Sequence, residues 1–316
     1  MDSLLRSIAD QDGIFLRREA LAVGYTDRAL ARAIRGRVIH RLRHGAYVFL
    51  DHWVELDESG RHLLRAMAVR RTARTGVVLS HTTALIKMGA PVWDLPLDDV
   101  HLTRRDGGAG RREAGVAQHS GLLLNGDVCE IDRVATTSAT RTAIDLTMVA
   151  DVEHCLPAID YLLHIGATDK AALVRRAGLC EVWPRTLATD LTIRLADGRS
   201  ESVGETRSRH MLWRGGLPTP EPQYDILDER GTVVARVDFA WPEYGVFLEF
   251  DGRAKYEKFL KEGEPVVAAV LREKKREEMI CRLTGWRCIR IVWADLYRPD
   301  ATNAYIRSVL AGGPVH

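Results

Sequence analysis

The clearest alternation of hydrophobic and polar positions covers residues 236–252, where the sequence predicts two strands joined by a short loop. Apolar side chains recur there with the period of two that is typical of half-buried strands. Pro242 and Gly245 indicate the turn between the strands. The alternation also places Asp238 in the first strand and Glu249 in the second, so each predicted strand carries an acid.

Pairing the two predicted strands brings these acids together. If residues 242–245 form the loop and the strands run antiparallel, Phe239 lies opposite Leu248 and Asp238 lies opposite Glu249. Directly opposed side chains have Cβ atoms about 5 Å apart, and like charges at that distance are destabilising. Two such carboxylates need a cation, or one of them must hold a proton. Mg²⁺ or Mn²⁺, held by one or two carboxylates and several waters, meets this need, with Asp238 and Glu249 as metal ligands.

The pattern around this pair predicts an α/β domain over residues 186–316. Its order is helix, three strands, helix, strand, with Glu205 on the first helix. Pro265 is expected to open the second helix, and Ile289 with Ile291 marks the last strand. The predicted elements are a helix over 203–214, strands over 223–227, 233–241 and 246–251, and a final strand before Trp293.

Residues 1–50 have a separate pattern, which predicts a winged helix-turn-helix. Short apolar stripes indicate two helices, and Thr26 caps a third over residues 27–35 that stops at Gly36. An alternating stretch over 38–49 contains a His44-Gly45 turn and predicts a hairpin. Over residues 12–43, three acids accompany a larger set of arginines: Arg17, Arg18, Arg28, Arg32, Arg35, Arg37, Arg41 and Arg43 against Asp12, Glu19 and Asp27.

This excess of arginine is typical of a protein that binds a phosphate backbone. Arg28 and Arg32, one turn apart on the third helix, are expected to face a DNA groove, and Arg41 and Arg43 to contact phosphate from the wing. The alternative is an ordinary solvated basic face.

The pattern over residues 51–185 predicts a mixed α/β domain. We assign no catalytic or metal-binding site to it. The Gly-rich turn at 106–110 lacks the Lys-Ser/Thr of a phosphate-binding loop. The intervals between His81, His101 and His119 match no usual set of metal ligands, and isolated histidines are more often structural. We therefore expect a scaffold or a partner-binding role for this domain.

Composition narrows the class of protein. The chain has 316 residues, of which 46% are hydrophobic and 28% charged, and a net charge of +2. These values indicate a globular protein of two or three domains. The sequence shows no signal peptide and no apolar stretch of membrane-spanning length, so the expected location is the cytoplasm and no membrane partner is expected. Five scattered cysteines without a CxxC pair indicate core residues.

The first 50 residues resemble the N-terminal domain of the AbiEi-type antitoxins, which are transcriptional autoregulators of type IV toxin-antitoxin systems. The residues that carry the resemblance are Gly13-Ile-Phe15 and Arg41-Leu-Arg-His-Gly-Ala-Tyr47. It extends loosely through Leu79-Ser-His-Thr-Thr-Ala84 and Thr137-Ser-Ala-Thr-Arg-Thr-Ala-Ile-Asp145. The resemblance implies binding to double-stranded DNA and a cognate toxin as a further partner, and it says little about catalysis.

Residues 200–298 resemble another group of proteins. Glu205, Asp238 and Glu249 in the order helix, strand, strand look like the core of the PD-(D/E)XK nucleases. Arg236-Val-Asp-Phe239, Phe250-Asp-Gly252 and the stretch 272–293 resemble the very-short-patch-repair (Vsr-like) endonucleases. This resemblance implies a restriction-endonuclease-like αβββαβ core and metal-dependent hydrolysis of DNA, with Asp238 as the central ligand.

The chain departs from the family patterns in two respects, and the first is that Asp251 stands where the repair enzymes have a histidine after the third strand. The second is that the same residue stands where the PD-(D/E)XK nucleases have the lysine that polarises the attacking water. Lys255, or Lys274 and Lys275 on the next helix, would then have to supply the cation. The expected catalytic residues are Glu205, Asp238, Glu249, Asp251 and Lys255.

Two of these acids have structural alternatives. Ser202-Val-Gly-Glu205 is also a helix capping box, and Asp251 falls opposite Arg236 in the expected register, as a cross-strand ion pair would. Two functions therefore stay open: a metal-dependent DNA endonuclease guided by its own winged helix, in a defence, toxin-antitoxin or repair setting, and a non-catalytic DNA-binding regulator whose nuclease-like domain is a binding module.

Overall fold

A computed structural model describes residues 2–73, 76–180, 184–252 and 266–313. Lys255 and Pro265, both named in the predictions, lie outside these residues. The chain forms two compact units, one of residues 1–158 and 167–190 and the other of residues 159–166 and 191–316. We call them the first and the second unit and describe each by itself. Both combine helices and sheets, which confirms an α/β multidomain fold.

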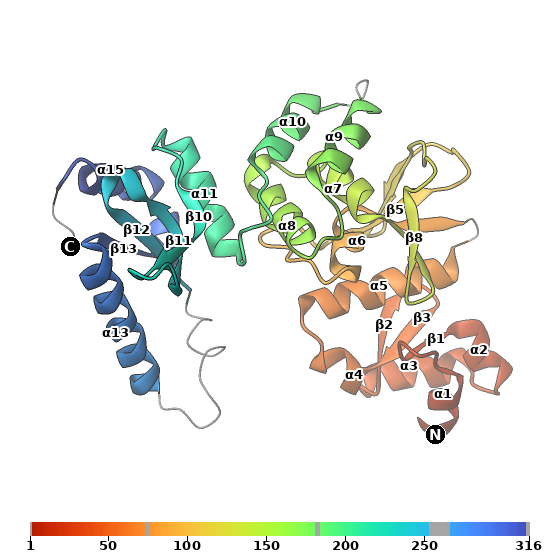
Figure 1. The fold of residues 1–316 in the computed structure, drawn as a ribbon. Coiled ribbons are helices and arrows are strands. Elements are labelled where there is room, and N and C mark those ends of the chain that lie inside the picture. Colours follow the sequence, from red (N-terminus) through yellow and green to blue (C-terminus); the bar gives the residue numbers. More distant parts are fainter. Residues whose placement is uncertain (1, 74–75, 181–183, 253–265, 314–316) are drawn as a thin grey trace. The chain divides into compact units, whose positions relative to one another are not determined.

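The first unit begins with the predicted helices and hairpin (Figure 1). Helix α3 has the expected bounds because Thr26 Oγ1 accepts a hydrogen bond from Ala29 N at 3.2 Å and Gly36 closes the helix. The hairpin strands pair as expected, and a further short strand joins them in the sheet order β1-β3-β2. The elements are α1 (Asp2–Ile8), β1 (Ile14–Leu16), α2 (Arg17–Ala22), α3 (Asp27–Arg35), β2 (Ile39–Arg43) and β3 (Ala46–Phe49).

A six-stranded sheet in the order β6-β7-β5-β4-β9-β8 forms the rest of the first unit, together with helices. Its strands are β4 (Val77–Leu79), β5 (Val100–Arg104), β6 (Arg111–Glu113), β7 (Val116–His119), β8 (Val128–Ile131) and β9 (Val134–Thr137). Its helices are α4 (Leu50–Glu55), α5 (Glu58–Thr72), α6 (His81–Lys87), α7 (Ala139–Thr147), α9 (Lys170–Gly178) and α10 (Thr186–Leu195), whose last residues belong to the second unit.

One hydrophobic core joins the winged helix to this sheet. It runs from Ile14 and Val48 through Met67 of α5 to Leu79 and Leu102. Burying these side chains together is the main stabilising contribution in such a unit. The first unit therefore holds both regions, and a domain boundary at residue 50 stays a prediction, as does the boundary at residue 185.

The second unit has the expected order αβββαβ. It contains α11 (Val203–Arg214), β10 (Glu221–Leu227), β11 (Val233–Trp241), a 3-10 turn η1 (Pro242–Tyr244), β12 (Val246–Asp251), α13 (Val266–Thr284), β13 (Arg287–Val292), α14 (Trp293–Leu296) and α15 (Pro299–Leu310). The sheet order is β10-β11-β12-β13, with β12 and β13 parallel and the other pairs antiparallel.

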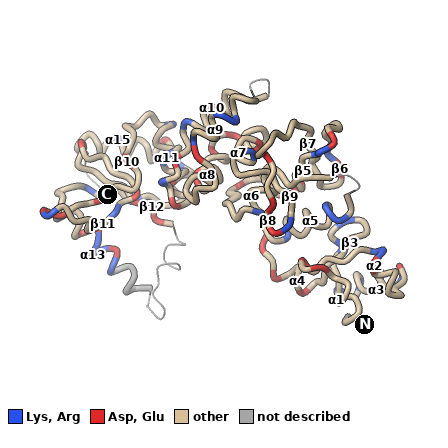
Figure 2. The backbone as a smooth tube through the Cα atoms, turned by 45° about the vertical axis from the view of Figure 1, so that its right-hand side comes forward, with Lys and Arg blue, Asp and Glu red and all other residues tan. Residues whose placement is uncertain are grey.

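Two hydrophobic clusters cover the two faces of this sheet. Phe239, Leu248 and Phe250 pack against α11 and α15 on one face. Phe247 and Ala240 pack with Ile280 of α13 on the other. Figure 1 shows α13 beside β13, and Figure 2 shows basic and acidic residues alternating along it. Glu249 lies on the α13 face together with Phe247, where Arg276 of α13 contacts it.

Helix α8 (Val152–His164) begins in the first unit and ends in the second. Within the second unit its Asp160, 1% exposed, accepts hydrogen bonds from Arg209 Nη2 at 2.5 Å and Thr206 Oγ1 at 2.7 Å.

The expectation that all cysteines are core residues is wrong for Cys129, which is exposed on β8. None of the helices in the described residues has the length and apolar character to cross a membrane.

Candidate functional sites

Helix α3 presents a stripe of arginines to solvent. Arg28, Arg32 and Arg35 follow the spacing i, i+4, i+7, which puts them on one face of the helix, and all three are exposed. Leu30 and Ala33 are buried on the face toward the core. Across the described residues no ion pair engages these three guanidinium groups. The stripe is therefore available to an anionic partner.

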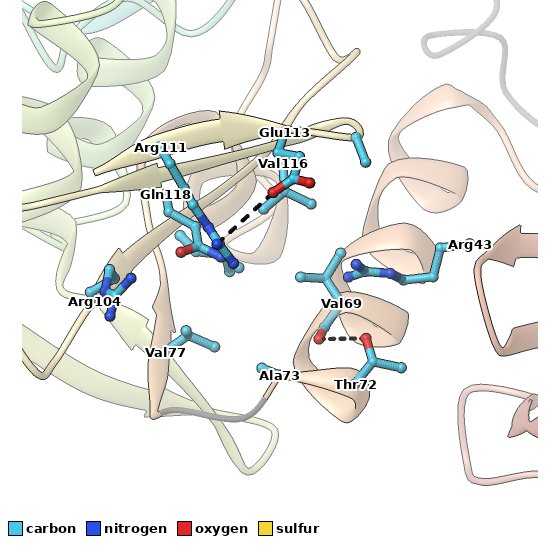
Figure 3. Close-up of a pocket in the computed structure, with 12 residues that line it drawn as sticks. Arg43, Val69, Thr72, Ala73, Val77, Arg104, Arg111, Glu113, Val116 and Gln118 are labelled. Atoms are coloured by element: carbon cyan, nitrogen blue, oxygen red, sulfur yellow. Dashed lines mark hydrogen bonds and ion pairs between the residues drawn. The ribbon is translucent and has the colours of Figure 1, made fainter. Parts of the chain in front are cut away.

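The wing arginines differ from each other. Arg41 is exposed, as expected of a phosphate contact. Arg43 is half-buried and extends into a cavity of about 480 Å³ that Arg104 and Arg111 also line (Figure 3). Burial lowers the pKa of the Arg43 guanidinium. Arg43 thus contributes positive charge inside a cavity rather than on the outer surface of the wing.

The predicted strand register is confirmed next to the acid pair. Phe239 pairs with Leu248 and Trp241 with Val246. Asp238 and Glu249 are the next residues after the Phe239–Leu248 pair, and their side chains lie in the interior. Asp238 is 8% exposed and Glu249 is 6% exposed. The backbone pairing of β11 with β12 does not continue to these two residues. The side chain of Asp238 takes its place, and Oδ2 accepts a hydrogen bond from Phe250 N at 2.8 Å. Both carboxylates are buried in the second unit.

A cation from α13 reaches this pair. Arg276 Nη1 lies 3.1 Å from Glu249 Oε1, and the same guanidinium donates to the carbonyl oxygen of Arg236. The sequence prediction assigned the cation to Lys255, Lys274 or Lys275. Lys274 and Lys275 are exposed on α13. Among the described residues, the cation that contacts Glu249 is therefore Arg276, one residue beyond Lys275, whereas the expectation for Lys255 stays a prediction because that residue lies outside them.

Glu205 is held by the start of its own helix. Its Oε1 accepts from Ser202 Oγ at 2.7 Å, and its Oε2 accepts from Glu201 N at 2.9 Å, while Ser202 Oγ accepts from Glu205 N at 3.2 Å. The Ser202 half of the expected capping box is thus present, whereas Glu205 accepts from the Ser202 hydroxyl and the Glu201 N–H instead of the Ser202 N–H. Gln223 Nε2 also donates to Oε2 at 2.9 Å. Gln223 has a φ of 52° and interrupts the β10–β11 ladder at the position that faces Asp238.

The expected ion pair between Asp251 and Arg236 is wrong. Arg236 binds Asp225 across β10 and β11, with Nε 2.6 Å from Oδ1. Asp251 Oδ2 lies 3.6 Å from Arg290 Nη1. The extrapolated register did not allow for the third strand β10, which supplies a nearer acid to Arg236.

These acids fit a metal ion under one condition. In the part of the chain that the structure describes, no acid of the second unit belongs to a group of three or more ligand residues with atoms within 4.8 Å of one another. Two carboxylates are enough for Mg²⁺, which keeps several waters in most protein sites. Glu249 must, however, exchange its contact with Arg276 for the ion. The residues fit a two-carboxylate site only once Arg276 withdraws.

Three histidines of the first unit lie together, although the sequence intervals gave no sign of it. The ring of His81 stacks on that of His119 with centroids 3.7 Å apart, and His101 Nδ1 lies 2.9 Å from His119 Nε2. Burial lowers the pKa of His101 to about 3 and holds that of His81 well below its usual value. The signal that sequence reasoning lacked is the parallel pairing of β5 with β7, which aligns His101 with Ala117 and Thr103 with His119.

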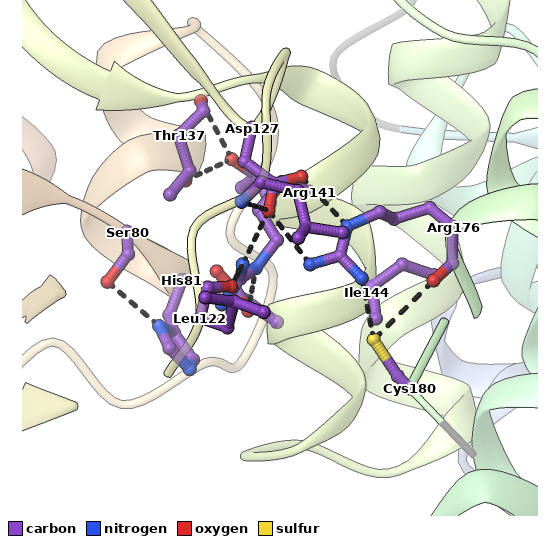
Figure 4. Close-up of polar contacts among 12 residues, drawn as sticks. Ser80, His81, Leu122, Asp127, Thr137, Arg141, Ile144, Arg176 and Cys180 are labelled. Atoms are coloured by element: carbon purple, nitrogen blue, oxygen red, sulfur yellow. Dashed lines mark hydrogen bonds and ion pairs between the residues drawn. The ribbon is translucent and has the colours of Figure 1, made fainter. Parts of the chain in front are cut away.

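A buried charge network lies on α7 and α9. Asp127 accepts from Arg141 Nη1 at 2.8 Å and from Arg176 Nε and Nη2 at 2.8 Å each (Figure 4). Arg141 Nε also donates to Asp145 Oδ1 at 2.7 Å, an i, i+4 pair within α7. Two acids balance two arginines, so the network holds this part of the unit together without a net charge.

Comparisons with known proteins add little about activity. No protein-family model matches the chain. Two curated proteins of Mycobacterium tuberculosis, "Uncharacterized protein MT2308" of strain CDC 1551 and "Uncharacterized protein Rv2248" of strain H37Rv, are each 39% identical over 103 residues. The match covers 33% of this chain and 34% of each relative, so the chain spans about a third of the length of the curated relatives it matches.

Proposed function

We propose that this chain is a cytoplasmic protein that binds double-stranded DNA through its winged helix. The observation that carries the proposal is the exposed stripe of Arg28, Arg32 and Arg35 on α3. In winged and helix-turn-helix proteins the corresponding helix enters the major groove, and arginines there contact bases and phosphates. Arg41 on the wing adds a phosphate contact beside it.

The test is the salt dependence of duplex binding. The variant Arg28→Ala with Arg32→Ala should weaken binding of a fluorescent duplex and reduce the slope of log K against log salt by up to about 2, since each phosphate contact contributes about 0.9. Lys170→Ala with Arg175→Ala removes the same charge from α9 and should leave the slope unchanged. Equal slopes in the wild type and the α3 variant would exclude α3 from the DNA contact.

For the second unit we propose metal-dependent hydrolysis of a DNA phosphodiester. Support comes from the αβββαβ order together with two buried acids on neighbouring strands. Asp238 and Glu249 would hold Mg²⁺ or Mn²⁺, which supplies an activated water and neutralises charge on the phosphate. The N–H of Phe250 orients Asp238, and Arg276, released from Glu249, is placed to bind a phosphate oxygen. Such an activity suits defence, toxin-antitoxin or repair.

The contact between Arg276 and Glu249 favours a second candidate. A carboxylate already balanced by a protein cation has less need of a metal ion, and Asp251 replaces the motif lysine. On this alternative the protein is a non-catalytic regulator, and its nuclease-like unit binds nucleic acid or a cognate toxin without cutting.

Plasmid nicking separates the two candidates. With Mg²⁺ or Mn²⁺, the wild type should nick duplex, mismatched or single-stranded substrates, and Asp238→Asn or Glu249→Gln should abolish the nicking. Glu243→Gln, an exposed acid in the turn between β11 and β12, is the matched control and should retain it. Absence of metal-dependent nicking by the wild type on all three substrates would contradict the nuclease and favour the regulator.

A further inference from the structure

The first unit contains a cluster of three imidazoles that neither DNA binding nor phosphodiester hydrolysis uses. His81 comes from the start of α6, His101 from β5 and His119 from β7. One ring nitrogen of each lies within 4.8 Å of those of the other two. Among the described residues, no other group of three histidine, cysteine or acidic side chains meets this condition. The cluster assembles segments that are far apart in the sequence.

Hydrogen bonds fix the backbone and one ring of this cluster. Ser80 N donates to the carbonyl of His101 at 3.2 Å, and His101 N donates to Thr83 Oγ1 at 2.8 Å. The start of α6 is thereby tied to β5 on both sides of His81. Ser80 Oγ lies 2.9 Å from His81 Nδ1, a contact that leaves Nε2 of that ring for a ligand. Outer partners of this kind orient metal-binding imidazoles.

The backbone dihedral φ of His81 also differs from the negative value of a residue in a right-handed helix. His81 has a φ of 50°, a left-handed conformation that costs energy for a residue with a Cβ. This conformation directs its ring to within stacking distance of His119. Strained residues of this type are concentrated at functional sites, where the surrounding structure holds them.

The cluster borders a cavity of about 380 Å³. His101 and His119 line it together with Thr82, Asp98 and Gln118. His81, which is 4% exposed, lies behind them. Three protein ligands on one side and an open cavity with a mixed polar and apolar lining on the other leave a fourth position for water or a small anion. Three histidines with an open fourth position are a common arrangement for Zn²⁺.

We propose that His81, His101 and His119 bind one Zn²⁺-class transition-metal ion, with its fourth position open to this cavity. Imidazole nitrogen suits Zn²⁺ and its neighbours in the first transition row, whereas Mg²⁺ prefers oxygen ligands. The ion is thus distinct from the Mg²⁺ or Mn²⁺ proposed for the second unit.

Binding requires a small rearrangement of the rings. Zn–N distances of about 2.0–2.1 Å in a tetrahedral site place the nitrogens roughly 3.3 Å apart. The contact of 2.9 Å between His101 Nδ1 and His119 Nε2 must therefore open slightly. The ring that donates this hydrogen bond moves its hydrogen to its other nitrogen, and the stack of His81 on His119 must tilt so that both lone pairs point at the ion.

The test uses the full-length chain without a histidine tag, stripped with a chelator and titrated with Co²⁺ and then Zn²⁺. The wild type should bind one ion per chain and show the visible absorption of tetrahedral Co²⁺, which Zn²⁺ removes. His101→Gln, His119→Gln and His81→Asn should each weaken binding at least tenfold. Asparagine is chosen at 81 because it tolerates a positive φ. The exposed His44→Gln is the control and should bind as the wild type does.

A second readout needs no variant. On addition of Zn²⁺ to the wild type, the ring signals of three histidines should shift in the NMR spectrum, and the melting temperature should rise. The proposal is overturned if the wild type binds neither ion, if the cluster variants that fold bind as tightly as the wild type, or if the shifted signals belong to other histidines.

Discussion

Arg276 Nη1 and Glu249 Oε1 lie 3.1 Å apart, so the carboxylate that we expect to bind a metal ion has a protein cation as its partner. Arg276→Met keeps the aliphatic stem and removes the charge. Because Arg276 is 30% exposed, we expect the loss in unfolding free energy to be below the 3–5 kcal/mol of a fully buried pair, at about 1–2 kcal/mol. Urea denaturation measures it.

The double variant Arg276→Met with Glu249→Gln, together with the two single variants, forms a double-mutant cycle. It should lose less stability than the sum of the single variants, because neither partner is left as an uncompensated charge. Arg276→Met alone should also bind Mn²⁺ more tightly than the wild type if the ion and the guanidinium compete for Glu249. Additive losses together with unchanged Mn²⁺ binding would contradict both expectations.

Gly204 marks a close approach between α11 and β12. A Cβ at this position would lie 1.9 Å from Phe250 Cε1, and Phe250 is 3% exposed with its ring packed edge-on against Trp293. We expect Gly204→Ala to cost about 1–3 kcal/mol, as overpacking does. Gly178→Ala on α9 meets open space and should be neutral or stabilising by up to about 1 kcal/mol. Thermal melts of both variants provide the comparison, and equal effects would exclude a steric cause.

Asp127 is the centre of the buried network in the first unit. Its side chain is 5% exposed and accepts from both Arg141 and Arg176. Asp127→Asn leaves two buried guanidinium groups without their shared acid, so we expect a loss of about 3–5 kcal/mol in unfolding free energy. Asp106→Asn alters an exposed pair with Arg104 and should leave the urea midpoint unchanged. A midpoint unaffected by Asp127→Asn would show that the network contributes no stability.

His62 predicts a pH dependence of stability. It is fully buried, its Nδ1 donates to Leu97 O at 3.0 Å, and its Nε2 lies 2.8 Å from Thr83 Oγ1. Burial lowers its pKa below the usual 6.5. Below pH 6.5 the unfolded chain takes up a proton that the folded chain rejects, so stability is complete above this pH and falls as the pH decreases.

His62→Asn keeps a donor for Leu97 O and removes the titration. The variant should be less stable than the wild type at pH 7.5, by about 1–3 kcal/mol for the lost partner of Thr83. The difference should narrow at pH 5.5. Urea midpoints at the two pH values measure it, and a gap that stays constant would contradict the assignment.

Local signals in the sequence predicted the second unit well. Helix α11 begins after Ser202 and ends before Gly215. Gly245, with a φ of 59°, closes the turn before β12. The alternation of apolar residues was sufficient to predict the pairing of Phe239 with Leu248. Capping, turn chemistry and periodicity act within a few residues, so they can be read without the fold.

The partners of the site residues were not predictable in the same way. Arg276 and Glu249 are 27 positions apart in the sequence. Arg236 forms its ion pair with Asp225 and not with Asp251, the partner expected from the sequence. His101 and His119 meet only because β5 and β7 run parallel. These contacts depend on which strands and helices become neighbours, and no short-range pattern encodes that choice.

Helix α8 has a practical consequence for dissecting the protein. Since Arg209 and Thr206 bind Asp160, a recombinant fragment that starts at residue 191 would leave both side chains without their acid in the interior. A fragment that also carries residues 159–166, by a linker or as an added peptide, restores it. The second unit is thus assembled from two separate stretches of polypeptide, and autonomous folding of the longer stretch should depend on the shorter one.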